Sequence, residues 1–96
     1  MNIQQMFVFY SDPGHGWLCV PAKLLRELGI ADRITAYSYK HGDSVYLEED
    51  QDMGVFIAAW EAQTGRQCNW TSVYLPDTDA RPNPIRSFVS YYSKTH

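Results

Sequence analysis

His15 is the side chain best suited to proton transfer, because it lies between two glycines in a turn that also contains an aspartate. The turn reads Ser-Asp-Pro-Gly-His-Gly over residues 11–16. A carboxylate such as that of Asp12 can orient an imidazole for general base catalysis or metal binding. No serine or cysteine stands in a recognisable nucleophile motif, so we interpret His15 as a loop residue and not a catalyst. Gly14 and Gly16 then serve the backbone geometry of the turn.

A second cluster is acidic and directly follows a predicted strand. Its carboxylates could bind a divalent cation, or favour the start of the next helix through the helix dipole. They could also dock on a basic partner, helped by nearby tyrosines, since complementary charge speeds association and tyrosine is enriched at interfaces. We predict a partner-binding surface made of Tyr37, Tyr46, Glu48, Glu49, Asp50 and Asp52.

The two cysteines, Cys19 and Cys68, have no spacing typical of a metal site. We therefore expect free thiols, no bound metal and no cofactor, with Cys19 buried as a small apolar residue. The N-terminal stretch lacks the basic region and long apolar run of a signal peptide, and no segment approaches membrane-spanning length. These features predict a cytoplasmic protein without a membrane partner.

Length and composition indicate one globular domain over residues 1–96. Hydrophobic residues make up 45%, charged residues 20% and aromatic residues 15% of the chain, a balance typical of a folded domain rich in aromatic side chains. The net charge is −3, which disfavours direct nucleic-acid binding.

The hydrophobic pattern predicts an α+β domain, with an antiparallel sheet of four to five strands and three short helices. Strands are expected at residues 7–10, 17–20, 34–39 and 44–48, with a further short strand within 67–75. Helices are expected after Pro21, after Asp52 and after Asn83, the first two ending at Gly29 and Gly65. Apolar residues recur with helical spacing in the second and third helices: Met53, Phe56, Ile57 and Trp60, then Ile85, Phe88, Val89 and Tyr92.

The first half of the chain resembles the swapped-hairpin, AbrB-like DNA-binding proteins, which include bacterial regulators and antitoxins. The resemblance rests on Val-Pro at positions 20–21, paired leucines in the short helix, and Leu-Gly-Ile at positions 28–30. It implies hairpin, short helix and second hairpin in this order, and a DNA-binding dimer. The first turn departs from the family pattern, because it carries Asp12 where that family has lysine or arginine.

The same block also resembles small proteins of prophages, plasmids and integrative elements. The shared string is Ser-Asp-Pro-Gly-His-Gly-Trp, then Val-Pro, Leu-Gly-Ile-Ala-Asp and Tyr-Leu-Glu-Glu-Asp. This resemblance implies a mobile-element origin, and small acidic proteins of such elements often inhibit host defence, as anti-CRISPR or antirestriction proteins do.

We therefore expect a non-enzymatic inhibitor that blocks a host protein or nucleoprotein complex with a basic surface. The alternative is an AbrB-like transcriptional regulator or antitoxin, and a small metal-dependent enzyme is a third, less favoured class. The sequence leaves open whether the protein forms a homodimer.

Overall fold

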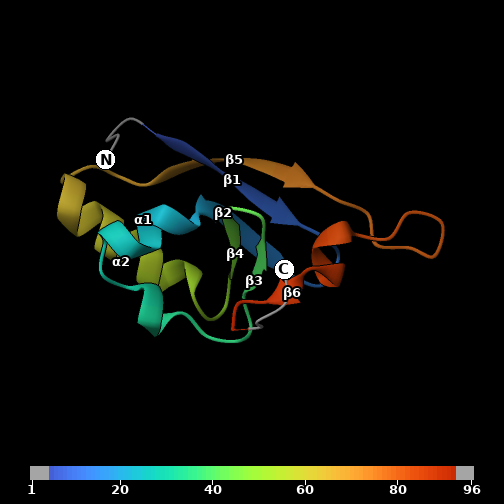
Figure 1. Ribbon diagram of the computed structural model, residues 1–96. Coiled ribbons are helices and arrows are strands. Elements are labelled where there is room, and N and C mark those ends of the chain that lie inside the picture. Colours follow the sequence, from blue (N-terminus) through green and yellow to red (C-terminus); the bar gives the residue numbers. More distant parts are fainter. Residues whose placement is uncertain (1–4, 93–96) are drawn as a thin grey trace.

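A six-stranded sheet with two helices forms the centre of the protein (Figure 1). The computed structural model describes residues 5–92, and it confirms the α+β class. Two 3₁₀ turns, η1 and η2, complete the fold. In chain order the elements are β1 (Met6–Ser11), β2 (Gly16–Pro21), α1 (Ala22–Glu27), η1 (Ala31–Arg33), β3 (Tyr39–His41), β4 (Ser44–Glu48), α2 (Met53–Thr64), β5 (Asn69–Tyr74), η2 (Pro84–Ser87) and β6 (Val89–Ser90).

The sheet is mixed, and its strand order is β5-β1-β2-β4-β3-β6. Neighbouring strands run antiparallel except β1 and β5, which pair in parallel from Met6 with Asn69 to Ser11 with Tyr74. The expectation of a purely antiparallel sheet of four to five strands is thus wrong in detail. A parallel partner needs a long crossover connection, and here α2 lies in that connection.

Both helices cover one face of the sheet and enclose a single core. Phe56 and Trp60 of α2 meet the ring of Phe7 edge-on, with ring centroids 5.2 and 5.8 Å apart. The predicted burial of the α2 stripe is confirmed for Met53, Phe56 and Trp60, whereas Ile57 is half-buried at the margin. The core also contains Leu18, Val20, Leu24, Leu25, Ile30, Ile34, Val45, Leu47 and Cys68.

The opposite face of the sheet is aromatic, and the segment that contains η2 and β6 partly covers it. Tyr46 lies between Tyr10 and Phe88, at ring distances of 6.1 and 5.0 Å. His41 stacks on Phe88 with centroids 4.2 Å apart. The aromatic composition noted in the sequence therefore builds a second, smaller packing layer, since paired rings contribute beyond the area that they bury.

Two predicted elements are wrong. Residues 34–38 form a loop, because the backbone N–H of Thr35 donates to the Asp52 carboxylate and not to a neighbouring strand. The predicted third helix is the short turn η2 followed by β6, which pairs with β3. The apolar residues at 85, 88, 89 and 92 therefore do not form one face of a helix, and their helical spacing in the sequence is coincidental.

The glycines of the first turn have a different role from the one predicted. Gly29, Gly42 and Gly65 have positive φ, whereas Gly14 and Gly16 do not. A Cβ on Gly16 would lie 2.3 Å from the ring of Phe9. Gly16 is therefore needed for the close approach of an aromatic side chain.

Both cysteines are free thiols, as expected. Cys19 is only half-buried, less than predicted, whereas Cys68 lies in the core. Burial raises the pKa of both thiols, to about 11 for Cys68, where the nearby Glu61 adds to the effect. Within residues 5–92, no helix combines the length and apolar character that crossing a membrane requires.

Candidate functional site

A pocket of about 350 Å³ brings together the two chemical clusters of the sequence. It lies where the turn after β1, the end of β4 and the C-terminal segment meet, and we name it the His15 pocket. Its lining combines charged and aromatic side chains, and a few convergent polar groups of this kind can orient a ligand or a partner's side chain. Its lining comprises His15, Trp17, Tyr37, Tyr39, Glu48, Asp50, Gln51 and Arg86.

Asp12 fixes the conformation of the turn between β1 and β2, beside the pocket. Its buried carboxylate accepts hydrogen bonds from the backbone N–H groups of Gly14 and His15, both at 2.9 Å. It also accepts from Asn83 Nδ2 at 2.9 Å, and from Arg86 Nε at 2.6 Å and Nη2 at 2.9 Å. These bonds tie the β1–β2 turn to the C-terminal segment. The Arg86 guanidinium above all holds the pKa of Asp12 well below its usual range, against the opposing effect of burial.

Arg86 is the cation of the pocket, but its charge is already neutralised. Its Nε lies 2.6 Å from Asp12 Oδ2 and 3.1 Å from Asp77 Oδ2, and its guanidinium lies over the Trp17 ring, 5.6 Å from the centroid. The hydrogen bond to Asp12 raises the pKa of Arg86. Arg86 therefore does not balance the lining carboxylates of Glu48 and Asp50, and these make the electrostatic potential of the pocket negative.

The Asp12 network predicts an acid-dependent stability. We expect Asp12→Asn to lower the free energy of unfolding at pH 7 by about 1.5–3 kcal/mol, the range for a hydrogen bond to a charged group. Because the pKa of Asp12 is lowered in the folded state, wild type has this stability in full above the unfolded value of 3.8 and loses it progressively as the pH falls from that value through the lower pKa of the folded state. Urea unfolding at pH 7 and pH 3 should show the difference between the two proteins shrinking in acid.

The exposed Asp79 provides the matched control for this prediction, since Asp79→Asn removes a carboxylate that has no such network. Its unfolding curve should follow wild type at both pH values. A difference between wild type and Asp12→Asn that is equally large at pH 3 would contradict the assignment to Asp12 ionisation.

His15 forms a histidine–carboxylate pair at the mouth of the pocket. Its Nδ1 lies 3.5 Å from Glu48 Oε1, and its side chain is about half exposed. The other oxygen of Glu48 accepts a hydrogen bond from the backbone N–H of Asp50 at 2.8 Å. Such a pair can orient an imidazole for proton transfer, yet the lining side chains include no serine, threonine or cysteine that it could activate. The geometry therefore fits an oriented hydrogen-bonding contact at a binding surface.

The structure divides the predicted partner-binding residues into two groups. Tyr37, Glu49 and Asp50 are exposed, Tyr37 to 67%, and Glu48 forms a wall of the pocket. We call these four residues the acidic-aromatic surface. Tyr37, on the loop before β3, lines the pocket together with Glu48 and Asp50 at the end of β4, and Glu49 lies between these two carboxylates in the chain.

Asp52 and Tyr46 do not belong to this surface. Asp52 is fully buried, and its carboxylate accepts from Thr35 N, Thr35 Oγ1 and Ser38 Oγ, the last at 2.5 Å. It stands at the N-cap of α2 without capping the helix through its side chain, and the first turn of α2 carries no acidic residue. Of the predicted acids only Asp52 thus stands at the start of α2, while Glu49 and Asp50 precede the helix.

Tyr46 lies on the sheet face opposite the helices, the face that also carries Glu48, and there it is half-buried between Tyr10 and Phe88. Burial, with a smaller contribution from Cys19, raises its pKa to about 12. Tyr46 is therefore less exposed than Tyr37, and we do not include it in the acidic-aromatic surface.

No protein-family model, curated protein or solved structure matches this chain. The functional argument below therefore rests on the residues and their geometry. Among residues 5–92, no group of three histidine, cysteine, aspartate or glutamate side chains is placed to hold a metal ion.

Several pocket residues were missed from the sequence. Arg86 carried no visible signal, because its partner Asp12 is far away along the chain and nothing local marks the pair. Trp17 and Tyr39 were expected in strands but not at a site, although the period of two in a strand puts Trp17 and Cys19 on one face and Leu18 on the other. Their rings lie 6.3 Å apart beside the pocket.

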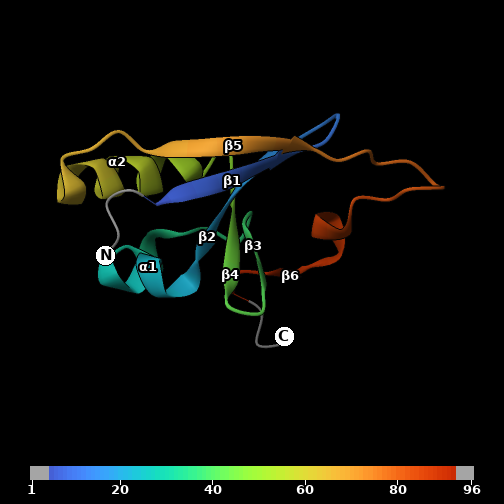
Figure 2. The same cartoon turned by 90° about the horizontal axis from the view of Figure 1, so that it is seen from above.

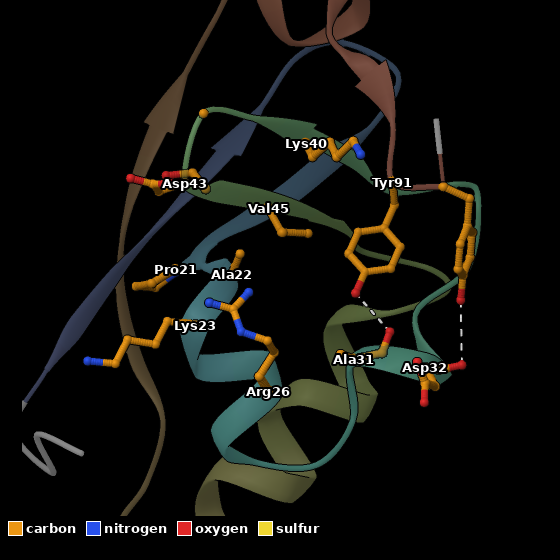
Figure 3. Close-up of a pocket in the computed structure, with 13 residues that line it drawn as sticks. Pro21, Ala22, Lys23, Arg26, Ala31, Asp32, Lys40, Asp43, Val45 and Tyr91 are labelled. Carbon is orange, nitrogen blue, oxygen red and sulfur yellow. Dashed lines mark hydrogen bonds between the residues drawn. The ribbon is translucent and has the colours of Figure 1, made fainter. Parts of the chain in front are cut away.

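A second, larger hollow of about 770 Å³ lies between α1 and the β3–β4 hairpin. Lys23 and Arg26 come from α1, and Lys40 reaches the same space from β3 (Figure 3). Tyr91 forms the far wall and donates its hydroxyl to the carbonyl of Ala31 at 2.8 Å. Asp32 and Asp43 also line the hollow, so its balance is only mildly basic. We call it the basic hollow, and the sequence analysis did not detect it.

Proposed function

We propose that this protein is a non-enzymatic binding protein of mobile-element origin that inhibits a host defence system, in the manner of anti-CRISPR or antirestriction proteins. It acts by covering a basic surface of a host nucleoprotein complex with its acidic-aromatic surface. A surface that normally contacts nucleic-acid phosphates is basic, and carboxylates beside an aromatic ring are complementary to it.

The observation that carries this proposal is the exposure of Tyr37 and Asp50 in the lining of a pocket whose arginine is already paired, with the exposed Glu49 next to Asp50 in the chain. Asp12 and Asp77 occupy Arg86, so Glu49 and Asp50 present uncompensated negative charge to a partner. Tyr37 adds an aromatic anchor of the type that dominates interface energies.

Charge reversal at this surface gives the direct test. We expect Glu49→Lys with Asp50→Lys to change the free energy of unfolding by less than about 0.5 kcal/mol, because both side chains are exposed. The partner is first captured from a bacterial lysate, with and without nuclease, and identified by mass spectrometry. Its association rate with the double variant, followed by surface plasmon resonance, should fall about tenfold or more and lose most of its salt dependence.

Asp79→Lys with Gln63→Lys and Gln67→Lys is the matched control, because it changes the net charge equally at exposed sites elsewhere. This control should associate nearly as fast as wild type. Equal binding of wild type and of the Glu49–Asp50 variant at low salt would place the interface elsewhere and overturn the proposal.

The basic hollow supports a second candidate, a DNA-binding regulator or antitoxin. Lys23, Arg26 and Lys40 lie together beside the hairpin–helix–hairpin segment whose order the AbrB-like resemblance implied, and lysine and arginine clusters bind phosphates. Electrophoretic mobility shift on random duplex DNA separates the two candidates. A shift that is abolished by Lys23→Glu with Arg26→Glu, but kept by the Glu49–Asp50 reversal, would favour the regulator.

A further inference from the structure

Among residues 5–92, strand β5 forms an open edge of the sheet. It is the first strand in the order β5-β1-β2-β4-β3-β6, and all six of its residues are exposed. Figure 2 shows β5 along the border of the sheet, with β1 on its inner side. An edge strand presents unpaired N–H and C=O groups, which are a template for another strand.

This edge lacks the devices that normally protect one. The strand reads Asn-Trp-Thr-Ser-Val-Tyr, without proline or charge, whereas protected edges carry lysine, proline or a bulge. Trp70, Val73 and Tyr74 are large exposed side chains, and Met6 lies exposed on the neighbouring strand. Because the strand is uncharged, two copies can approach here without local repulsion, although the chain has a net charge of −3.

The direction of the backbone groups in β5 follows from one hydrogen bond. Leu75 N donates to Ser11 O on β1 at 2.7 Å. Successive residues of a strand point their N–H and C=O groups to opposite sides, so Thr71 and Val73 also face β1. Trp70, Ser72 and Tyr74 therefore direct their backbone groups outward, away from the sheet.

We propose that β5 pairs in antiparallel orientation with β5 of a second copy of this chain. The two copies are related by a two-fold axis that passes midway between their Ser72 residues. Such an axis is perpendicular to the sheet, so the helix-covered face of one copy continues into that of the other. Ser72 then lies opposite Ser72, and Trp70 opposite Tyr74 of the second copy. All three outward residues form hydrogen-bonded pairs, which gives about six new main-chain hydrogen bonds.

The side chains fit this register as well. In the parallel pairing Trp70 lies beside Phe7, which packs against α2, so Trp70 and Tyr74 share the helix-covered face. Across the axis they form an aromatic pair, and Thr71 meets Val73 on the other face; cross-strand pairs of both kinds stabilise sheets. An axis through Thr71 would instead place Trp70 opposite Ser72 and leave Tyr74 opposite Cys68, outside the strand.

Ser72→Pro tests the proposal with little risk to the fold. Its N–H points outward, and proline is tolerated on an edge strand where that group faces solvent. Wild type and the matched control Ser72→Ala should sediment as dimers at high micromolar concentration. Ser72→Pro should sediment as a monomer, with a dimer dissociation constant raised about tenfold or more by the lost central bonds. Circular dichroism checks that each variant is folded.

If Ser72→Pro does not fold, Ser72→Lys replaces it, because it sets two like charges against each other on the axis. A Ser72→Cys variant reports the register independently: it should crosslink to itself under mild oxidation faster than Thr71→Cys or wild type. A wild-type monomer at all concentrations, or a folded Ser72→Pro or Ser72→Lys dimer, would overturn the proposal. These measurements need no partner, so they fail independently of the proposed function.

Discussion

Asp52→Ala is expected to lower the free energy of unfolding by about 3–5 kcal/mol, because three donors lose their acceptor and each costs about 1–3 kcal/mol when left unsatisfied. The carboxylate is fully buried and accepts from Thr35 N, Thr35 Oγ1 and Ser38 Oγ. Ser38 Oγ in turn accepts from Glu48 N at 3.0 Å. The substitution therefore loosens the loop before β3 and the end of β4 together. Urea denaturation monitored by tryptophan fluorescence measures the loss.

Asp50→Ala is the control, since it removes a carboxylate of the same cluster that is exposed. It should unfold within about 0.5 kcal/mol of wild type. If Asp52→Ala were equally stable, water would have replaced the carboxylate at little cost, and the loop would not depend on this side chain.

Phe56→Ala is expected to cost about 3–5 kcal/mol, the usual range for a buried phenylalanine truncated to alanine. The ring is fully buried at the centre of α2 and meets Phe7 edge-on. Its removal leaves a cavity between helix and sheet that the packed neighbours cannot close. Thermal unfolding should show a clearly lower midpoint than wild type.

Gln63→Ala on the same helix is exposed and serves as its control, because it changes helix propensity by a small amount only. Its midpoint should stay close to that of wild type. A Phe56→Ala protein that melts like the control would mean that α2 does not pack on the sheet through this face.

The sequence predicted elements well where local pattern and tertiary packing agree. The strands around the first turn, α1, β4 and α2 are found near their predicted positions, with glycine stops at Gly29 and Gly65. The strand expected at 34–39 failed because the Asp52 carboxylate, distant in sequence, takes the backbone donor of Thr35. The helix expected after Asn83 failed because helical spacing over one short segment does not outweigh pairing with β3.

The candidate site was predicted only in part, for a related physical reason. Charge and residue type marked Tyr37, Glu49 and Asp50, and these are exposed. They could not show that Asp52 turns inward, because a buried and an exposed carboxylate look alike in a sequence. They could not reveal Arg86 either, since its pairing with Asp12 exists only after both ends of the chain are folded.

The parallel pairing of β1 with β5 has a consequence for how the chain reaches its native state. Met6 pairs with Asn69 and Ser11 with Tyr74, so this contact closes a loop that includes most of the domain. Such contacts raise the contact order, which slows folding, because the entropy of closing the loop is lost before the contact forms. During synthesis β1 can form its hairpin with β2 early, yet its other side stays unpaired until β5 leaves the ribosome. We expect β1 to be the strand most exposed to wrong pairing in that interval.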